Sequence, residues 1–275
     1  MCLPAAAQSQ ASLDTGSHVP SAAPPQFELE GLAQWRNITG DGAITTANFG
    51  SISLMNDLGI GRLHAGPLAR FIWTPRFKFL GATSKAWVEY GQIDRIRTHN
   101  LTETITFAGN TYIVNSTLKT ELKTRQFEAG YTYRWGNDKF RVGPSFTYER
   151  LDVDFVLTEV GAHLPQPLRA EVDVPNNVYL IGGDFDYTQI RHIDIEGHFG
   201  FVPCCGGGWH VFESELGAKY YFARHFSLMG GVRYSYLKRD FGLPATTVAG
   251  VTVGPFSGFL KFPGVGPFVG ASYRF

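Results

Sequence analysis

The feature that most constrains this chain is a two-residue alternation of apolar and polar side chains, which begins at residue 27 and recurs to the end. Successive side chains of a β-strand point to opposite faces, so each such segment predicts a strand with one apolar face and one polar face. In segment 265–275 the odd positions are mostly apolar or aromatic, whereas the even positions are mostly Gly, Ser or Arg. The same alternation runs through 129–135, 140–149, 216–222 and 228–236.

Two architectures use such strands: a soluble sandwich or barrel with its apolar face inward, and a membrane barrel with its apolar face toward lipid. The polar face favours the second, because it is crowded with Gly, Ser and Thr beside isolated charges, as a narrow lumen requires. We therefore predict an all-β fold, a transmembrane antiparallel up-and-down β-barrel of about ten strands, with eight or twelve as alternatives. The expected strands cover 27–37, 66–80, 86–107, 111–135, 139–158, 177–189, 193–203, 209–222, 226–239 and 262–275.

The connections between these strands alternate in length. Outer-membrane barrels have short periplasmic turns and longer extracellular loops, so the alternation predicts that both termini are periplasmic. Aromatic residues flank two of the short turns, Trp135 and Phe140 at the first and Phe222 and Phe226 at the other, and are expected to form an interfacial girdle. The short turns are 136–139, 190–192 and 223–225, and the long connections are 38–65, 159–176 and 240–261.

Composition excludes several other classes of protein. Lys plus Arg and Asp plus Glu both number 24, so no net charge favours a nucleic-acid partner. Charged residues make up only 17% of the chain and aromatic residues 14%, which excludes a largely disordered chain. No run of 18 apolar residues is present, so a membrane-spanning helix is not predicted.

The first 25 residues lack the alternation. Ala5-x-Ala7 matches the small-residue cleavage motif of a secretory signal, so residues 1–25 are predicted to be the remaining tail of a signal peptide and a disordered lead-in. An ordinary disordered terminus is the alternative. Residues 26–275 are predicted to be the barrel. Cys204 and Cys205 are adjacent and lack the spacing of a zinc site, so we interpret them as two thiols in a Gly-rich turn.

The chain ends on Phe275 with Tyr273 two residues earlier, and this ending resembles the C-terminal assembly signal of bacterial outer-membrane β-barrels. Segments Asn56–Gly59, Thr106–Tyr112 and Phe127–Tyr133 resemble a group of such barrels to which no activity is assigned. The resemblance implies a monomer in the outer membrane of a Gram-negative cell envelope. Its expected partners are outer-membrane lipid and the barrel-assembly machinery, which would engage the C-terminal strand. No cofactor is expected.

Charged residues gather on the predicted polar face. Because an unpaired charge in a confined lumen is costly, we expect acids and bases to pair across the lumen and plug it. A transverse field in a narrow passive channel for small polar solutes is the alternative. The acidic cluster comprises Asp184, Asp186, Asp194, Glu196, Glu213 and Glu215, together with His198, and the basic cluster comprises Arg70, Arg76, Lys78, Arg134, Arg141, Arg233 and Arg274.

The predicted hairpin of 177–189 and 193–203 places even-numbered residues inward on both strands. A register in which paired numbers sum to 380 or 382 then sets Asp186 opposite Asp194 or Glu196, so that like charges meet. We therefore expect at least two of the four acids on this hairpin to lie within salt-bridge reach of a base from a non-adjacent strand. Arg76, Lys78 and Arg141 are the bases expected at that depth.

Two motifs raise enzymatic alternatives. Asp184 and Asp186 with Asp194 and His198 loosely resemble the acidic and Asp/His pairs of the omptin outer-membrane proteases, and His225-x-Ser227 resembles the His-x-Ser of lipid A deacylases. Both groups lie near short turns, at the predicted periplasmic end, whereas omptin sites lie near the extracellular rim. We therefore predict a non-enzymatic barrel without catalytic residues, and an omptin-like or lipid-modifying enzyme is the alternative. The same acids could suit Ca²⁺ or Mg²⁺, but no metal is predicted, because acids share a face on paired strands without one.

Overall fold

A computed structural model describes most of the chain from residue 27 onward, and all regular structure in its described residues is β. Within them no helix is long and apolar enough to cross a membrane. The described residues are 27–38, 41–45, 52–53, 63–75, 80–102, 104–107, 110–160, 168–203, 209–243, 246–248, 251–253 and 256–275.

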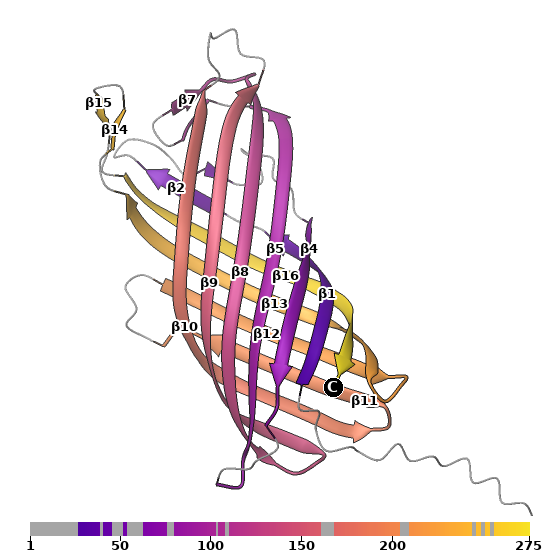
Figure 1. Cartoon of the computed structure of the whole chain (residues 1–275). Helices are drawn as coiled ribbons and strands as arrows, with labels where there is room; N and C mark the ends of the chain where they lie inside the picture. The colour runs from indigo at the N-terminus through magenta and orange to yellow at the C-terminus, as the bar shows by residue number, and fades with distance from the viewer. Residues whose placement is uncertain are drawn as a thin grey trace, which may run out of the picture.

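Ten strands form a closed antiparallel barrel, as the alternation predicts (Figure 1). Each strand pairs with the next along the chain, and the last pairs with the first in a register that sets Glu28 opposite Arg274. The staves are β1 (Phe27–Ile38), β4 (Leu63–Trp73), β5 (Thr83–Asn100), β8 (Thr117–Gly136), β9 (Phe140–Val160), β10 (Arg169–Ile190), β11 (Ile193–Phe201), β12 (Trp209–Tyr221), β13 (Phe226–Leu243) and β16 (Phe256–Arg274).

The apolar face of each of these ten barrel strands, or staves, points outward. Tyr131, Val142, Phe199, Phe201 and Val232 are 41–51% exposed, and their neighbours along each strand are buried or half-buried in the lumen. A soluble barrel would bury the first set and expose the second. The orientation is therefore that of a transmembrane barrel, whose apolar exterior faces lipid.

The two ends of the barrel differ. At one end lie the short turns 137–139, 191–192 and 222–225, and the backbone of Phe275 donates to the carbonyl of Phe27 at 3.0 Å, so both ends of the described chain lie there. The other end carries the small strands, which extend the sheet or form separate hairpins. They are β2 (Asp41–Thr45), β3 (Ile52–Ser53), β6 (Ile105–Phe107), β7 (Asn110–Tyr112), β14 (Thr246–Val248) and β15 (Val251–Val253).

Several predicted strand boundaries were wrong. The strand expected to end at 80 ends at Trp73, because Pro75 cannot donate to a ladder and Leu80 and Gly81 adopt positive φ angles of 49° and 78° in a turn. The strand expected from 86 begins at Thr83.

Four staves, β5, β8, β9 and β10, extend beyond the rest of the barrel (Figure 1), and along them the two faces exchange character. On β9 the outward side chains are apolar from Phe140 to Tyr148 and charged at Arg150, Asp152 and Asp154. The first stretch is about 27 Å of strand at ~3.4 Å per residue, of the same order as an apolar membrane band. We call the part beyond it the extension. Its inner face is an apolar core that includes Leu101, Leu118, Leu122, Val153, Phe155 and Leu157.

Candidate functional site in the barrel lumen

The hairpin β10–β11 brings acidic side chains together on the lumen face. From Ile181 to Tyr187 its residues pair with numbers that sum to 382, so Asp186 lies opposite Glu196 and Asp184 lies opposite His198. Like charges therefore meet directly across one pair of strands, which requires cations from elsewhere.

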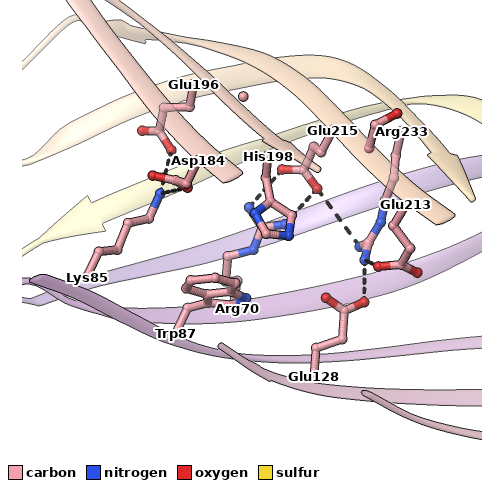
Figure 2. Close-up of a pocket in the computed structure, with 12 residues that line it drawn as sticks. Arg70, Lys85, Trp87, Glu128, Asp184, Glu196, His198, Glu213, Glu215 and Arg233 are labelled. Carbon is pink, nitrogen blue, oxygen red and sulfur yellow. Dashed lines mark hydrogen bonds and ion pairs between the residues drawn. The ribbon is translucent and has the colours of Figure 1, made fainter. Parts of the chain in front are cut away.

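Lys85 and Arg134, from strands that do not pair with this hairpin, supply cations to it. Lys85 Nζ lies 3.2 Å from Asp184, 3.9 Å from Asp186 and 3.6 Å from Glu196. Arg134 lies 3.4 Å from Asp184 and also pairs with Asp186. Lys85 is on β5, so its pairs cross the lumen (Figure 2), whereas Arg134 is on β8 and its pairs reach over β9 to β10.

Lys219 is the most enclosed cation of the lumen among the described residues, with its side chain 2% exposed. Its Nζ lies 3.1 Å from Glu28, 2.5 Å from Glu30 and 2.7 Å from Glu196. It thereby ties β12 to β1 on one side and to β11 on the other.

Arg274 adds a fourth cation at the short-turn end. It lies 3.4 Å from Glu28 and 3.3 Å from Asp194, and its guanidinium carbon is 3.9 Å from the ring centroid of Tyr221. A guanidinium that stacks on a ring while it pairs with two acids is held in one orientation.

Arg70 and Arg233 cross the middle of the barrel. Arg70 donates through both terminal nitrogens to Glu215 at 2.9 and 2.7 Å, and its Nε donates to Glu89 at 2.7 Å. Arg233 pairs with Glu89 and Glu128 and lies 3.6 Å from Glu213. The fork of Arg70 on one carboxylate is the bidentate geometry of strong charge-assisted hydrogen bonds.

An aromatic ring fills the space that remains at this level. Trp87 contacts His198 edge-on with 5.3 Å between ring centroids (Figure 2), and a Cβ on Gly130 would lie 2.0 Å from the Trp87 ring. Gly130 is therefore needed for the ring to lie flat in the lumen. The cavity that Trp87 and His198 line, with Arg70, Lys85 and Arg233 among its other walls, measures ≈ 30 Å³, which is room for about two waters.

The structure places all six acids of the predicted acidic cluster on the lumen face, each within 4.0 Å of an Arg or Lys. Of the predicted bases, Arg70, Arg134, Arg233 and Arg274 take part. Arg141 contacts Asp138 at 3.6 Å instead, because it lies beside the turn, where the nearest acid is three residues away in the chain. Arg76 and Lys78 lie outside the described residues.

Sequence reasoning missed Lys85 and the acids Glu28, Glu30, Glu89, Glu128 and Glu149. Lys85 was missed because the predicted strand began one residue after it. The acids other than Glu149 were detectable, since each alternates with apolar or small neighbours in the same way as the residues that were chosen, whereas Glu149 is followed by the charged Arg150.

Most residues of the two enzyme-like motifs have other partners. Asp184 and Asp186 are paired with cations, and neither ring nitrogen of His198 has a hydrogen-bond partner among the described residues. His225 Nδ1 lies 2.8 Å from the carbonyl of Arg274, and the Ser227 hydroxyl lies 2.6 Å from that of Ser272.

Comparison with known proteins agrees with this architecture. No protein-family model matches the sequence, and the search of curated proteins found no relative. Among solved structures, the outer-membrane protease OmpT from Escherichia coli matches 92% of this chain and 98% of its own, with a TM-score of 0.55 at 9% identity. Two further matches have lower TM-scores. A FadL homologue from Pseudomonas aeruginosa has a TM-score of 0.35 at 10% identity, and the match covers 91% of this chain and 90% of the homologue. Ail from Yersinia pestis has a TM-score of 0.31 at 7% identity, and the match covers 88% of this chain and 99% of Ail.

The chain thus has the closed fold of an outer-membrane β-barrel. At 9% identity the match to OmpT supports the fold alone. The Asn56–Gly59 segment, one of those that carried the family resemblance, lies outside the described residues.

Proposed function

We propose that this protein is an integral barrel of the bacterial outer membrane, non-enzymatic and non-conducting, which presents its extension and loops at the cell surface. The observation that carries the proposal is the set of ion pairs that crosses the lumen. Cations on β4, β5, β8, β12, β13 and β16 each reach an acid on a strand that is not their neighbour.

The energetics of these pairs favour a permanent plug over a gate. Removing one partner from a buried ion pair costs roughly 3–5 kcal/mol, because the other charge is left uncompensated. A path for solute along the lumen would require several pairs to separate at once.

Single-channel recording in planar bilayers tests this proposal against the narrow-channel alternative. We expect no conductance steps from the refolded protein, and we expect steps from Trp87→Ala combined with Arg233→Ala, which removes the ring and a central cation. Val88→Ala is the matched control, because Val88 adjoins Trp87 but points outward. Reproducible steps from the unaltered protein would establish the channel instead.

We further propose that the short turns and both termini face the periplasm and that the extension faces the exterior. The asymmetry of the two barrel ends supports this orientation. In a cysteine-free background, Asp154→Cys should react with a membrane-impermeant maleimide on intact cells, whereas Asn137→Cys should react only after lysis. The opposite pattern would reverse the orientation.

The non-enzymatic part of the proposal rests on the pairing of the candidate acids with cations, which leaves them poorly suited to activate a water. The test is hydrolysis of basic peptides and of acylated lipid by the refolded protein. Activity that is abolished by Asp186→Asn or by Ser227→Ala would revive the corresponding enzyme alternative.

The C-terminal strand is proposed as the contact for the assembly machinery. In the barrel, β16 pairs with both β13 and β1 and so closes the sheet, and Phe275 packs edge-on against Tyr273 with 4.8 Å between centroids. Deletion of Phe275 should lower the fraction of folded barrel recovered from outer membranes, and normal recovery would contradict this role.

A further inference from the structure

A second cavity lies beyond the ion pairs, where the inner face changes from polar to apolar. It measures ≈ 50 Å³, and its walls include Ile93, Leu151, Val153, Val211 and Leu237. At about 10–15 Å³ per water, the space suits a molecule of a few non-hydrogen atoms.

The floor of this cavity is acidic. Glu149 and Glu213 line it, and both lie against Glu128, so that one carboxylate oxygen from each of the three residues lies within 4.8 Å of the others. All three side chains are buried, with Glu149 3% exposed.

Hydrogen-bond donors are too few for these carboxylates. Gln126 Nε2 lies 2.5 Å from Glu128, 3.0 Å from Glu149 and 3.2 Å from Glu213, although an amide nitrogen has only two hydrogens for these three acceptors. The second oxygen of Glu149, Oε2, is buried and has no hydrogen-bond partner among the described residues. Such a group calls for a donor from the cavity side.

The balance of charged groups at the floor also favours a cationic ligand. Arg233 pairs with Glu128 and lies near Glu213, while Arg36, which also lines the cavity, donates to the amide oxygens of Gln126 and Gln34 at 2.8 and 3.0 Å. Arg233 also pairs with Glu89, so the guanidinium groups near the floor are fewer than the carboxylates around them.

We propose that this cavity binds a small primary alkylammonium ion, with its ammonium on Glu149 Oε2 and Glu213 and its alkyl part between the apolar walls. Ammonium supplies three N–H donors and a positive charge. A calcium ion would need six to eight oxygen ligands, and the cavity walls are mostly apolar, with the Arg36 guanidinium among them.

The test is calorimetric titration of the full refolded chain in detergent micelles with n-propylammonium chloride, and with 1-propanol as the uncharged probe of similar size. We expect saturable one-to-one binding of the ammonium ion only. Glu149→Gln should weaken it by at least tenfold, and Val211→Phe, which fills the cavity, should abolish it. Glu121→Gln, a carboxylate on the extension beside Lys119, should leave it unchanged.

Retained heat-modifiable migration on gels confirms that each variant is folded. Absence of saturable binding, or binding that survives both Glu149→Gln and Val211→Phe, would overturn the proposal. Calcium that binds this floor and excludes n-propylammonium would overturn it in favour of a metal site. None of these outcomes depends on whether the lumen conducts, so this inference and the proposed function can fail separately.

Discussion

Replacement of Lys219 by Met should strongly destabilise the barrel, because it deletes a buried charge and keeps a side chain of similar length. Lys219 is 2% exposed and lies within 3.1 Å of three carboxylates, on Glu28, Glu30 and Glu196. After the substitution these acids would remain in the lumen with one fewer cation.

The expected loss in free energy of unfolding follows from the cation that each acid still pairs with after the substitution. Glu28 retains Arg274 at 3.4 Å, Glu30 retains Arg70 at 3.3 Å, and Glu196 retains Lys85 at 3.6 Å. No acid is left wholly uncompensated, so the loss should fall at the lower end of the range for broken buried pairs, about 3 kcal/mol. Glu30→Gln in the same chain should recover much of this loss, because Glu30 is fully buried and its charge is then removed as well.

The assay is equilibrium urea unfolding of the protein folded into lipid vesicles, followed by tryptophan fluorescence. Lys119→Met is the matched control, since Lys119 is 41% exposed and, among the described residues, forms an ion pair with Glu121 alone, at 2.7 Å, so its loss should cost no more than about 1 kcal/mol. If Lys219→Met also costs less than about 1 kcal/mol, the lumen is well hydrated and the argument for a dry plug is wrong.

Two further substitutions test other parts of the structure by the same unfolding assay. Gly130→Val should destabilise the barrel by ~1–3 kcal/mol, because its Cβ would meet the Trp87 ring at 2.0 Å. Adding Trp87→Leu should relieve the effect. An unchanged urea midpoint of unfolding in Gly130→Val would show that the ring is not fixed there. On the extension, partial burial and the Asp154 carboxylate opposite it raise the pKa of Asp173, so Asp173→Asn should stabilise by ~0.2–1 kcal/mol at pH 7. This gain in stability should shrink as the pH falls through the raised pKa, because the unaltered Asp173 then takes up a proton. The control Asp152→Asn, which loses the 3.1 Å pair with Arg150, should give no gain.

Much of the barrel could be predicted because it depends on local information. Whether Tyr131 or Thr132 faces lipid follows from parity alone, and the turn at 137–139 fixes the pairing of the strands beside it. The same parity placed Asp184, Asp186 and Glu196 on the lumen face. These inferences need no knowledge of distant strands.

The cross-lumen partners could not be predicted in the same way. Which cation reaches Asp184 depends on the stagger of ten strands around the barrel, and an error of a few residues in one strand boundary changes the depth of every side chain on it. Lys85 was lost through such an error. Arg141 has the right parity, but it lies beside Asp138 in the turn.

The exchange of faces along β9 explains why an ion-pair network and an apolar cavity occur in one barrel. A strand alternates with period two on both sides of Tyr148, so periodicity alone reads Phe140–Val160 as one uniform element. What changes is which face is apolar. From Phe140 to Tyr148 the outer face contacts lipid, so its side chains are apolar and the charged side chains lie in the lumen. From Arg150 onward the outer face contacts water, so charged side chains lie outside and apolar side chains pack inside. The lumen must therefore pass from polar to apolar at this level, and Glu149 and Leu151 lie at that transition.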